Sequence, residues 1–335
     1  MSTPAISLSQ SSLRCDLVQE LLGSQQSLPQ AEQSPSADQA RLIIMSTELE
    51  IEPLKTLWRS LLDLNIKQLL IDKLSSQAWQ LLLDAPLNPD QVSKIATLKN
   101  LSLEVGIEVN YLAEGVAPFI REEGALACFD MDSTLIQVEV IDELAKAAGV
   151  GEQVAAVTEA AMRGELDFRE SFIQRMATLQ GLDESVLANI AANIPLSPGM
   201  PELIAGLKEL GFKTAIFSGG FDYFAGQLQQ RFGFDQIFAN RLDIVDGKVT
   251  GKAIGDIVDA QRKAELLEQL AAEYSVPMSS TIAVGDGAND LLMLAKAGMG
   301  VAYRAKPIVR EQAEFSISTL GLDAVLYLLA QSKDS

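Results

Sequence analysis

Two carboxylates separated by one residue, Asp130 and Asp132, are the side chains of this chain best suited to do chemistry. They directly follow the apolar run 125–129, which predicts a short buried strand. One carboxylate could act as a nucleophile while the other carries protons, with a divalent cation neutralising both. An Asp-x-Asp pair alone is weak evidence, because most such pairs lie in solvated turns. The case for chemistry therefore depends on residues further along the chain.

Three later stretches carry residues that complement this pair. Ser218 and Gly219 follow a predicted strand and precede a helix, where backbone N–H groups can bind a phosphate. Lys263 lies at the start of another predicted helix and could supply a positive charge to the same oxygens. Asp286 follows a further predicted strand within Gly-Asp-Gly-Ala-Asn-Asp, where oxygen atoms could hold a hard cation.

Each of these stretches also has an ordinary structural explanation. Ser-Gly-Gly is more often a plain turn, a lysine at a helix start is usually solvated, and Asp286 could simply cap a helix. The glycines around Asp286 do not form a dinucleotide-binding motif, because Asn289 and Asp290 occupy its last two places. The joint occurrence of all the stretches in this order favours a phosphate and metal site.

Residues at the carboxyl ends of strands meet only if the strands share a parallel sheet. Helical stretches lie between most of the apolar segments in the second part of the chain, which indicates a doubly wound parallel α/β sheet. The helical interval of about 140–196, directly after the first strand, predicts a cap over the site. An Asp-Gly turn at 246–247 predicts a β-hairpin. The six predicted strands are 125–129, 213–217, 237–239, 281–284, 299–302 and 315–317.

The first part of the chain has a different pattern. Residues 1–40 are expected to form a flexible segment, because a stretch rich in Ser, Gln and Pro lacks periodicity. Over residues 41–120, apolar segments in the order β-α-β-β-α-β predict a small ferredoxin-like α+β domain. We expect one of its helices at Pro89–Leu98 and its last strand at Ser102–Tyr111. The catalytic domain is then expected over residues 121–335.

Composition narrows the function further. The 335 residues carry a formal net charge of −19, which argues against nucleic acid and anionic membranes as partners. The chain has no histidine, so Ser-His-Asp and Cys-His catalysis are excluded. With only Cys15 and Cys128, a reducing, cytoplasmic location is expected. We expect no secretion signal and no membrane-spanning segment, and a homo-oligomer stays open.

The motifs together resemble the haloacid dehalogenase superfamily and, within it, the phosphoserine phosphatase family. The resemblance covers about residues 125–329. Serine after the second aspartate, where many superfamily members carry glycine, is typical of this branch. The matching stretches are Phe-Asp-Met-Asp-Ser-Thr-Leu from residue 129, Val-Glu-Val-Ile-Asp-Glu from 138, Ser-Gly-Gly-Phe-Asp from 218, Phe-Ala-Asn-Arg-Leu from 238 and Val-Gly-Asp-Gly-Ala-Asn-Asp from 284.

The resemblance implies a phosphatase that hydrolyses O-phosphoserine through an aspartyl phosphate, as the last step of serine biosynthesis. It implies that Asp130 is the nucleophile, that Asp132 is the general acid–base, and that the first domain resembles amino-acid-binding regulatory (ACT-like) domains. Mg²⁺ would be held by Asp130, the main-chain carbonyl of Asp132, and Asp286, with Asn289 close by. The phosphoryl-binding residues would be Ser218, Gly219 and Lys263, and the substrate-binding cap residues would be Glu139 and Arg175 for the amino and carboxylate groups, with the apolar Met162 and Phe168.

Three alternatives stay open at this point. A phosphatase of the same superfamily could act on another small phosphomonoester, and the cap contacts would then differ. A phospho-accepting signalling domain also phosphorylates an aspartate on an α/β sheet, although Asp132 and the helical cap argue against a stable phosphorylated state. The first domain could bind serine or another amino acid and regulate the second, but nothing in residues 41–111 identifies a ligand pocket.

Overall fold

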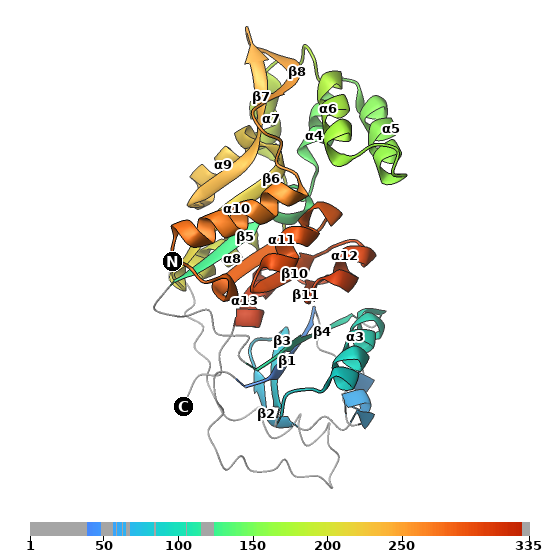
Figure 1. Ribbon diagram of the computed structural model, residues 1–335, viewed down its shortest axis with the longest axis vertical. Helices are drawn as coiled ribbons and strands as arrows, with labels where there is room; N and C mark the ends of the chain where they lie inside the picture. Colours follow the sequence, from blue (N-terminus) through green and yellow to red (C-terminus); the bar gives the residue numbers. More distant parts are fainter. Residues whose placement is uncertain are drawn as a thin grey trace. The chain divides into compact units, whose positions relative to one another are not determined.

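The chain divides into two compact units in the computed structural model (Figure 1). The first unit comprises Met1–Pro118, Ser318–Leu320 and Ala324–Ser335, and the second Phe119–Ile317 and Gly321–Asp323. Almost all of the segment 1–40, which we expected to be flexible, lies outside the described residues. The structure describes residues 39–47, 56–57, 59–61, 63–64, 68–83, 85–104, 106–114 and 124–329.

A four-stranded antiparallel sheet in the order β2-β3-β1-β4 forms the first unit. Helical residues at 56–57 and 59–61 precede β2, so the described elements follow the β-α-β-β-α-β order of a ferredoxin-like fold. One face of the sheet carries an apolar cluster that includes Leu42, Ile44 and Val109. The elements are β1 (Arg41–Ser46), β2 (Gln68–Lys73), β3 (Ala78–Leu83), α3 (Pro89–Glu104) and β4 (Ile107–Leu112).

One boundary in this unit differs from the sequence prediction. Ser102 was expected to begin a strand, but α3 continues to Glu104. Gly106, at φ +74°, donates its N–H to the carbonyl of Leu103 and ends the helix. Alternating leucines and polar residues fit a short strand as well as a helix, so the left-handed glycine decides where the strand begins.

The second unit contains a seven-stranded sheet in the order β11-β10-β9-β5-β6-β7-β8. Neighbouring strands are parallel except for β7 and β8, which form the predicted hairpin with Asp246 and Gly247 at positive φ in its turn. All six predicted strands are present. The strands are β5 (Ala125–Phe129), β6 (Phe212–Phe221), β7 (Gln236–Val245), β8 (Lys248–Ile254), β9 (Thr281–Gly285), β10 (Met299–Tyr303) and β11 (Phe315–Ile317).

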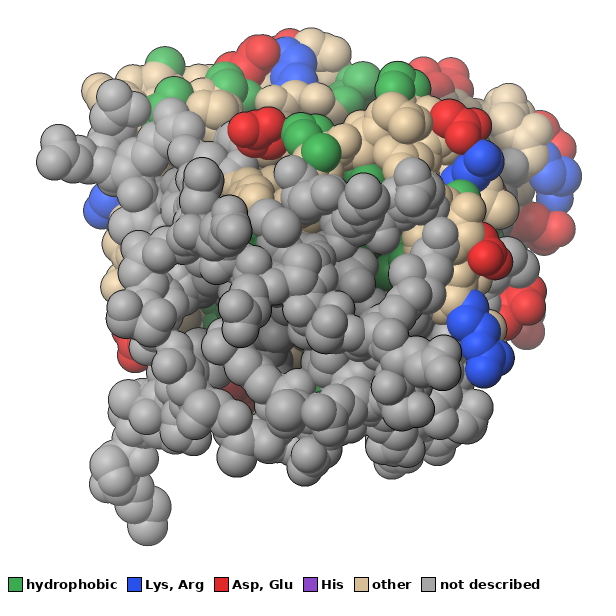
Figure 2. Space-filling model, turned by 90° about the horizontal axis from the view of Figure 1, so that it is seen from below, with side chains coloured by type: hydrophobic (Ala, Val, Ile, Leu, Met, Phe, Trp, Pro, Cys, Tyr) green, Lys and Arg blue, Asp and Glu red, His purple; other side chains and the backbone are tan. Residues whose placement is uncertain are grey.

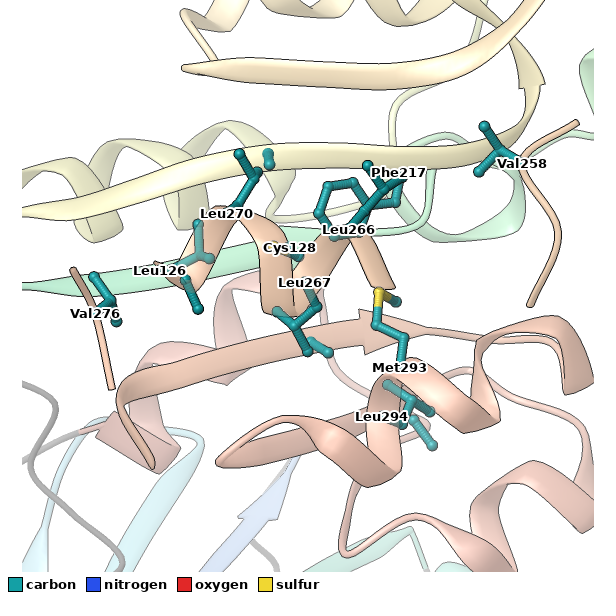
Figure 3. Packing of buried hydrophobic residues seen from close by; sticks show 14 of the residues in the cluster. Leu126, Cys128, Phe217, Val258, Leu266, Leu267, Leu270, Val276, Met293 and Leu294 are labelled. Carbon is teal, nitrogen blue, oxygen red and sulfur yellow. The ribbon is translucent and has the colours of Figure 1, made fainter. Parts of the chain in front are cut away.

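Helices cover the faces of this sheet and close its core. Figure 3 shows leucines of α10 packed beside Leu126 and Cys128 of β5, together with Met293 and Leu294 of α11. Every residue of β5 is buried, which explains why the run 125–129 is uninterruptedly apolar. The helices of this unit after the cap are α8 (Met200–Glu209), α9 (Asp222–Phe232), α10 (Ala260–Glu273), α11 (Leu291–Lys296) and α12 (Pro307–Gln312), whereas α13 (Val325–Leu329) falls in the first unit.

A helical cap lies between β5 and β6 in the chain, as the sequence predicted, and Figure 1 shows α4, α5 and α6 grouped together. Its two connections to the sheet meet where Ile136 and Leu196 form an antiparallel bridge. Its loop after α6 is bonded to the β7–β8 hairpin, because Val249 exchanges backbone hydrogen bonds of 2.7 and 2.8 Å with Gly181 and Leu182. The cap helices are α4 (Val140–Ala147), α5 (Gly151–Met162), α6 (Phe168–Thr178) and α7 (Ser185–Asn193).

The surface and the helix lengths bear on possible partners. No helix in the described part of the chain combines the length and apolar composition that crossing a bilayer requires. Figure 2 shows one face of the molecule, on which described acidic and basic side chains lie interspersed with apolar ones. On that part of the face, charges of one sign do not gather into a single patch.

Candidate active site

Asp130 stands at the carboxyl end of β5, in the middle of the sheet. Its N–H donates to the carbonyl of Val284 on β9 at 2.9 Å, and the residue is only 5% exposed. Its Oδ1 accepts the N–H of Met131 at 2.8 Å and the ammonium of Lys263 at 2.7 Å. Both hydrogen bonds described for this carboxylate go to Oδ1. The other oxygen, Oδ2, is therefore the one available to react.

Lys263 lies in the first turn of α10, and its side chain is fully buried. Asp259 caps this helix by accepting the N–H of Arg262 at 2.9 Å. The ammonium donates to Oδ1 of Asp130 and to Oδ1 of Asp290, each at 2.7 Å. Burial alone would lower the pKa of Lys263, but the two carboxylates raise it above its ordinary value. Lys263 thus bridges two buried carboxylates, those of Asp130 and Asp290.

An acidic cluster surrounds this bridge. Asp130, Asp286 and Asp290 each offer a carboxylate oxygen, and these oxygens lie within 4.8 Å of one another. Burial, then the charges of Asp290 and Glu139, raises the pKa of Asp286 to about 7. Its Oδ1 also accepts the hydroxyl of Thr134 at 3.2 Å. Three carboxylates around one buried ammonium leave an excess of negative charge, and oxygen donors suit a hard divalent cation.

The cluster differs in membership from the ligand set implied by the sequence. Asp130 and Asp286 belong to it as expected, and Asp290 joins them. Asp290 is completely buried and also accepts the N–H of Gly287 through Oδ2 at 3.0 Å. The sequence interpretation gave it no role, although it stood beside Asn289 in the same motif. Asn289 lies in the short 3-10 helix η3 (Ala288–Asp290) and is half-buried.

Asp132 occupies the turn that follows β5 and is 9% exposed. Burial, followed by the nearby charge of Glu139, raises the pKa of its carboxyl well above the ordinary value. Its Oδ1 accepts the N–H of Val140 at 3.3 Å, which ties it to the start of the cap. A Cβ at Gly220 would collide with Oδ2 of Asp132, so glycine is needed for this close approach.

The loop at the end of β6 holds the predicted phosphate-binding residues. Ser218 is buried, and its hydroxyl accepts the N–H of Gly220 at 2.8 Å. Asn240, on the adjacent β7, donates its amide to the carbonyl of Gly219 at 2.8 Å and accepts the N–H of Val258 at 2.8 Å. Asn240 therefore joins this loop to the segment that leads into α10. The sequence motif contained Asn240, but only the fold reveals what its amide contacts.

The cap reaches the same loop through aromatic side chains. A Cβ at Gly219 would lie 3.1 Å from the Phe168 ring, so the ring packs directly on the loop. Phe168 is stacked on Phe172 with centroids 6.4 Å apart, and Phe172 lies 6.1 Å from Phe221 at the end of β6. This run of rings places Phe168 against the loop that carries Ser218 and Gly219.

The remaining cap residues carry charge. Glu139 stands at the N-cap position of α4, is exposed, and accepts the Ser133 hydroxyl at 2.8 Å. Arg175 lies in the last turn of α6 with its Nε buried and no hydrogen-bond partner for that atom in the described part of the chain. Burial lowers the pKa of Arg175, whereas Glu139 and other nearby carboxylates raise it. Met162 ends α5, and its side chain lies outside what the structure describes.

Comparison with known proteins identifies the class of fold and site. A family model described as haloacid dehalogenase-like hydrolase matches residues 125–298. The chain belongs to the haloacid dehalogenase-like hydrolase family. Haloacid dehalogenase-like hydrolases use a divalent metal, and the acidic cluster of Asp130, Asp286 and Asp290 could bind one.

Individual relatives within the family carry a common name. The chain is 47% identical over 224 residues to a phosphoserine phosphatase of Vibrio cholerae, covering 67% of this chain and 68% of that protein. It is 49% identical over 214 residues to a phosphoserine phosphatase of Idiomarina loihiensis, covering 64% of this chain and 97% of that protein. The solved structure of a probable phosphoserine phosphatase from Vibrio cholerae matches with a TM-score of 0.73 and 37% identity, over 92% of each chain.

Proposed function

We propose that this protein is a phosphatase that hydrolyses O-phospho-L-serine to L-serine and inorganic phosphate, and so completes serine biosynthesis. The observation that carries the proposal is the Asp130 carboxylate, held by the buried Lys263 beside an acidic cluster, with one oxygen left to react. The relatives named phosphoserine phosphatase support the choice of substrate.

The first chemical step would transfer the phosphoryl group to the protein. Oδ2 of Asp130 attacks phosphorus in line with the serine oxygen, the P–O bond to serine breaks, and an aspartyl phosphate forms. Asp132 gives its proton to the departing oxygen. Its raised pKa suits this role, because an ordinary aspartic acid is mostly ionised near neutral pH.

The second step would release phosphate. The carboxylate of Asp132 takes a proton from a water molecule, and the resulting hydroxide attacks phosphorus. The bond between phosphorus and Asp130 breaks, so Asp130 returns as a carboxylate and Asp132 is again protonated. The ammonium of Lys263 and the backbone N–H groups at Ser218 and Gly219 would bind the phosphoryl oxygens in both steps.

The metal in this proposal is Mg²⁺. Asp130, Asp286 and Asp290 offer carboxylate oxygens suited to a hard cation, and we propose that the carbonyl of Asp132 and nearby Asn289 complete the surroundings. When bound, the ion would neutralise the phosphate so that an anionic nucleophile can approach it. The raised pKa of Asp286 fits a carboxyl placed among other negative charges.

Recognition of the serine part would fall to the cap. Arg175 has a buried Nε without a partner in the described part of the chain, and a substrate carboxylate could pair with its guanidinium in two parallel hydrogen bonds. Glu139, whose charge acts on Arg175, would bind the ammonium. Phe168 would cover the apolar carbon atoms of the substrate and exclude water, and Met162 remains a proposed substrate-binding residue. A phosphate lacking the amino-acid part would leave these charges unpaired.

The proposal extends to the protein's location, partners and domains. We propose a cytoplasmic enzyme acting on a small molecule, with neither nucleic acid nor membrane as a partner, which could assemble as a homo-oligomer. We further propose a regulatory amino-acid-binding domain over 41–120 and a catalytic domain over 121–335, with its cap at about 140–196. The four-stranded sheet of the first unit supports the first of these two domains.

A steady-state assay tests the proposal. The full chain should release phosphate from O-phosphoserine with Mg²⁺ and stop when the metal is chelated. Phosphoethanolamine and 3-(phosphonooxy)propanoate, which lack the carboxylate and the ammonium respectively, should be poor substrates. Arg175→Ala should chiefly raise KM for phosphoserine. Equal turnover of all three compounds by the unaltered protein would leave a phosphatase of this family with a different substrate.

A further inference from the structure

We propose that Ser133 is a positioning residue for substrate selection, whose hydroxyl orients Glu139 toward the substrate ammonium. The inference rests on the proposed function, because it assigns a purpose to a contact of Glu139. Ser133 lies between the aspartate Asp132 and Thr134, and it carries no role in the mechanism above.

The backbone at Ser133 is unusual. Its φ is +59°, in the left-handed region that glycine adopts without strain and a residue with a Cβ does not. Glycine would therefore be the undemanding choice in this turn. A serine here costs conformational energy, so its side chain is expected to provide something in return.

The contact of the hydroxyl indicates what that is. Ser133 Oγ donates to Oε1 of Glu139 at 2.8 Å. Glu139 stands at the N-cap position of α4, yet its side chain makes no capping hydrogen bond. Because the hydroxyl occupies Oε1, Oε2 remains for a cation. A hydrogen bond to one oxygen also restricts the rotamers of a long, exposed side chain, which reduces the entropy that binding would otherwise cost.

Backbone contacts hold this pair in register with the catalytic turn. The N–H of Ser133 donates to the carbonyl of Val138 at 3.3 Å, and the N–H of Val140 donates to Oδ1 of Asp132 at 3.3 Å. The residues on both sides of Glu139 are thus bonded to the turn that carries Asp132. With Ser133 Oγ added, the ammonium-binding carboxylate and the proton-transferring carboxylate are fixed relative to each other.

Two substitutions separate the hydroxyl from the backbone strain. Ser133→Gly removes the hydroxyl and relieves the left-handed strain, whereas Ser133→Ala removes the hydroxyl and keeps the strain. Both should raise KM for phosphoserine by about tenfold, the effect of losing one hydrogen bond to a charged group. Ser133→Gly should raise the thermal midpoint above that of the unaltered protein, whereas Ser133→Ala should leave it equal or lower. Ser185→Ala, which removes a 2.6 Å hydroxyl-to-carboxylate bond to Asp183 elsewhere in the cap, is the matched control and should leave KM unchanged.

The substrate panel decides between a positioning and a merely structural role. With Ser133→Gly, KM should rise for phosphoserine and phosphoethanolamine, which carry the ammonium, and stay unchanged for 3-(phosphonooxy)propanoate, which does not. In a Glu139→Gln background the same substitution should have no further effect. An equal KM rise for all three substrates, or none, would overturn the proposal. Failure of the proposed function would show differently, as an absence of preference for phosphoserine in the unaltered protein.

Discussion

Lys263 and Asp130 are 133 positions apart in the chain, yet the ammonium of one lies 2.7 Å from Oδ1 of the other and both are buried. The contact exists because the carboxyl end of β5 and the first turn of α10 lie at the same edge of the sheet. A second carboxylate, Asp290, lies 2.7 Å from the same ammonium. An ion pair with so little access to water depends on complete pairing, because an unpaired buried charge is costly.

Asp290→Asn should therefore impair catalysis although Asp290 neither attacks phosphorus nor transfers a proton in the proposed mechanism. The amide cannot balance the charge of Lys263, so the ammonium should shift toward Asp130 and weaken it as a nucleophile. We expect kcat/KM for phosphoserine to fall by at least about tenfold, the size of a lost hydrogen bond to a charged group. Asp235→Asn is the control, because it breaks a 3.0 Å pair with Lys213 that is partly solvated. Turnover by Asp290→Asn within twofold of the unaltered protein would contradict the account.

Asn240→Asp should weaken phosphate binding. The carboxylate cannot donate to the carbonyl of Gly219, so the loop that surrounds the phosphate loses a fixed contact. Competitive inhibition by inorganic phosphate should weaken by about tenfold, while inhibition by serine, which contacts the cap, stays unchanged. Asn193→Asp alters a similar 2.8 Å amide contact on an exposed helix and serves as the control. Parallel losses of phosphate and serine inhibition would indicate general damage to the fold instead.

The stability of the metal-free protein should depend on pH through Asp286. Its folded pKa of about 7 lies above the value of about 3.9 in an unfolded chain. Such a carboxyl favours folding below its unfolded pKa, and this contribution is lost as pH rises through the folded pKa. The thermal midpoint without metal should fall between pH 5 and pH 8, and Asp286→Asn should make the fall smaller.

Magnesium provides the complementary measurement. The ion binds the carboxylate and competes with the proton, so it should raise the thermal midpoint more at pH 8 than at pH 5. In Asp286→Asn the difference between the two pH values should shrink. An identical pH profile in both proteins, with and without magnesium, would show that Asp286 is not the group responsible.

Much of the fold could be predicted because each strand of the parallel sheet is a short apolar run that can be recognised from its own residues. The run 125–129 is apolar throughout because both faces of β5 are covered, and the Asp246-Gly247 turn specifies its hairpin. The strand expected from Ser102 was wrong at its start, since α3 extends to Glu104. Local periodicity could not distinguish a helix from a strand at these residues. The left-handed conformation of Gly106, seen only in the structure, ends the helix there.

Several side chains singled out from the sequence lie together in the structure, but their pairings were not predicted. Asp130 and Asp286 were singled out because each follows a predicted strand, and Lys263 because it begins a predicted helix; ligands bind at such positions. The bridging role of Asp290 and the two bonds of the Asn240 amide were missed, since they link residues far apart in the chain. The contact of Ser133 with Glu139 spans only six positions, but the residue types alone do not indicate that Ser133 has a left-handed backbone conformation.

Covalent labelling of Asp130 tests the account most directly. The full chain is mixed with O-phosphoserine and Mg²⁺, quenched in acid within milliseconds, digested and analysed by mass spectrometry. The account predicts a phosphate on the peptide that contains Asp130. It should be present at early times, when more serine than inorganic phosphate has been released, and absent in Asp130→Asn. A protein that turns over phosphoserine while Asp130 stays unmodified, or whose phosphate is carried by another residue, would contradict it.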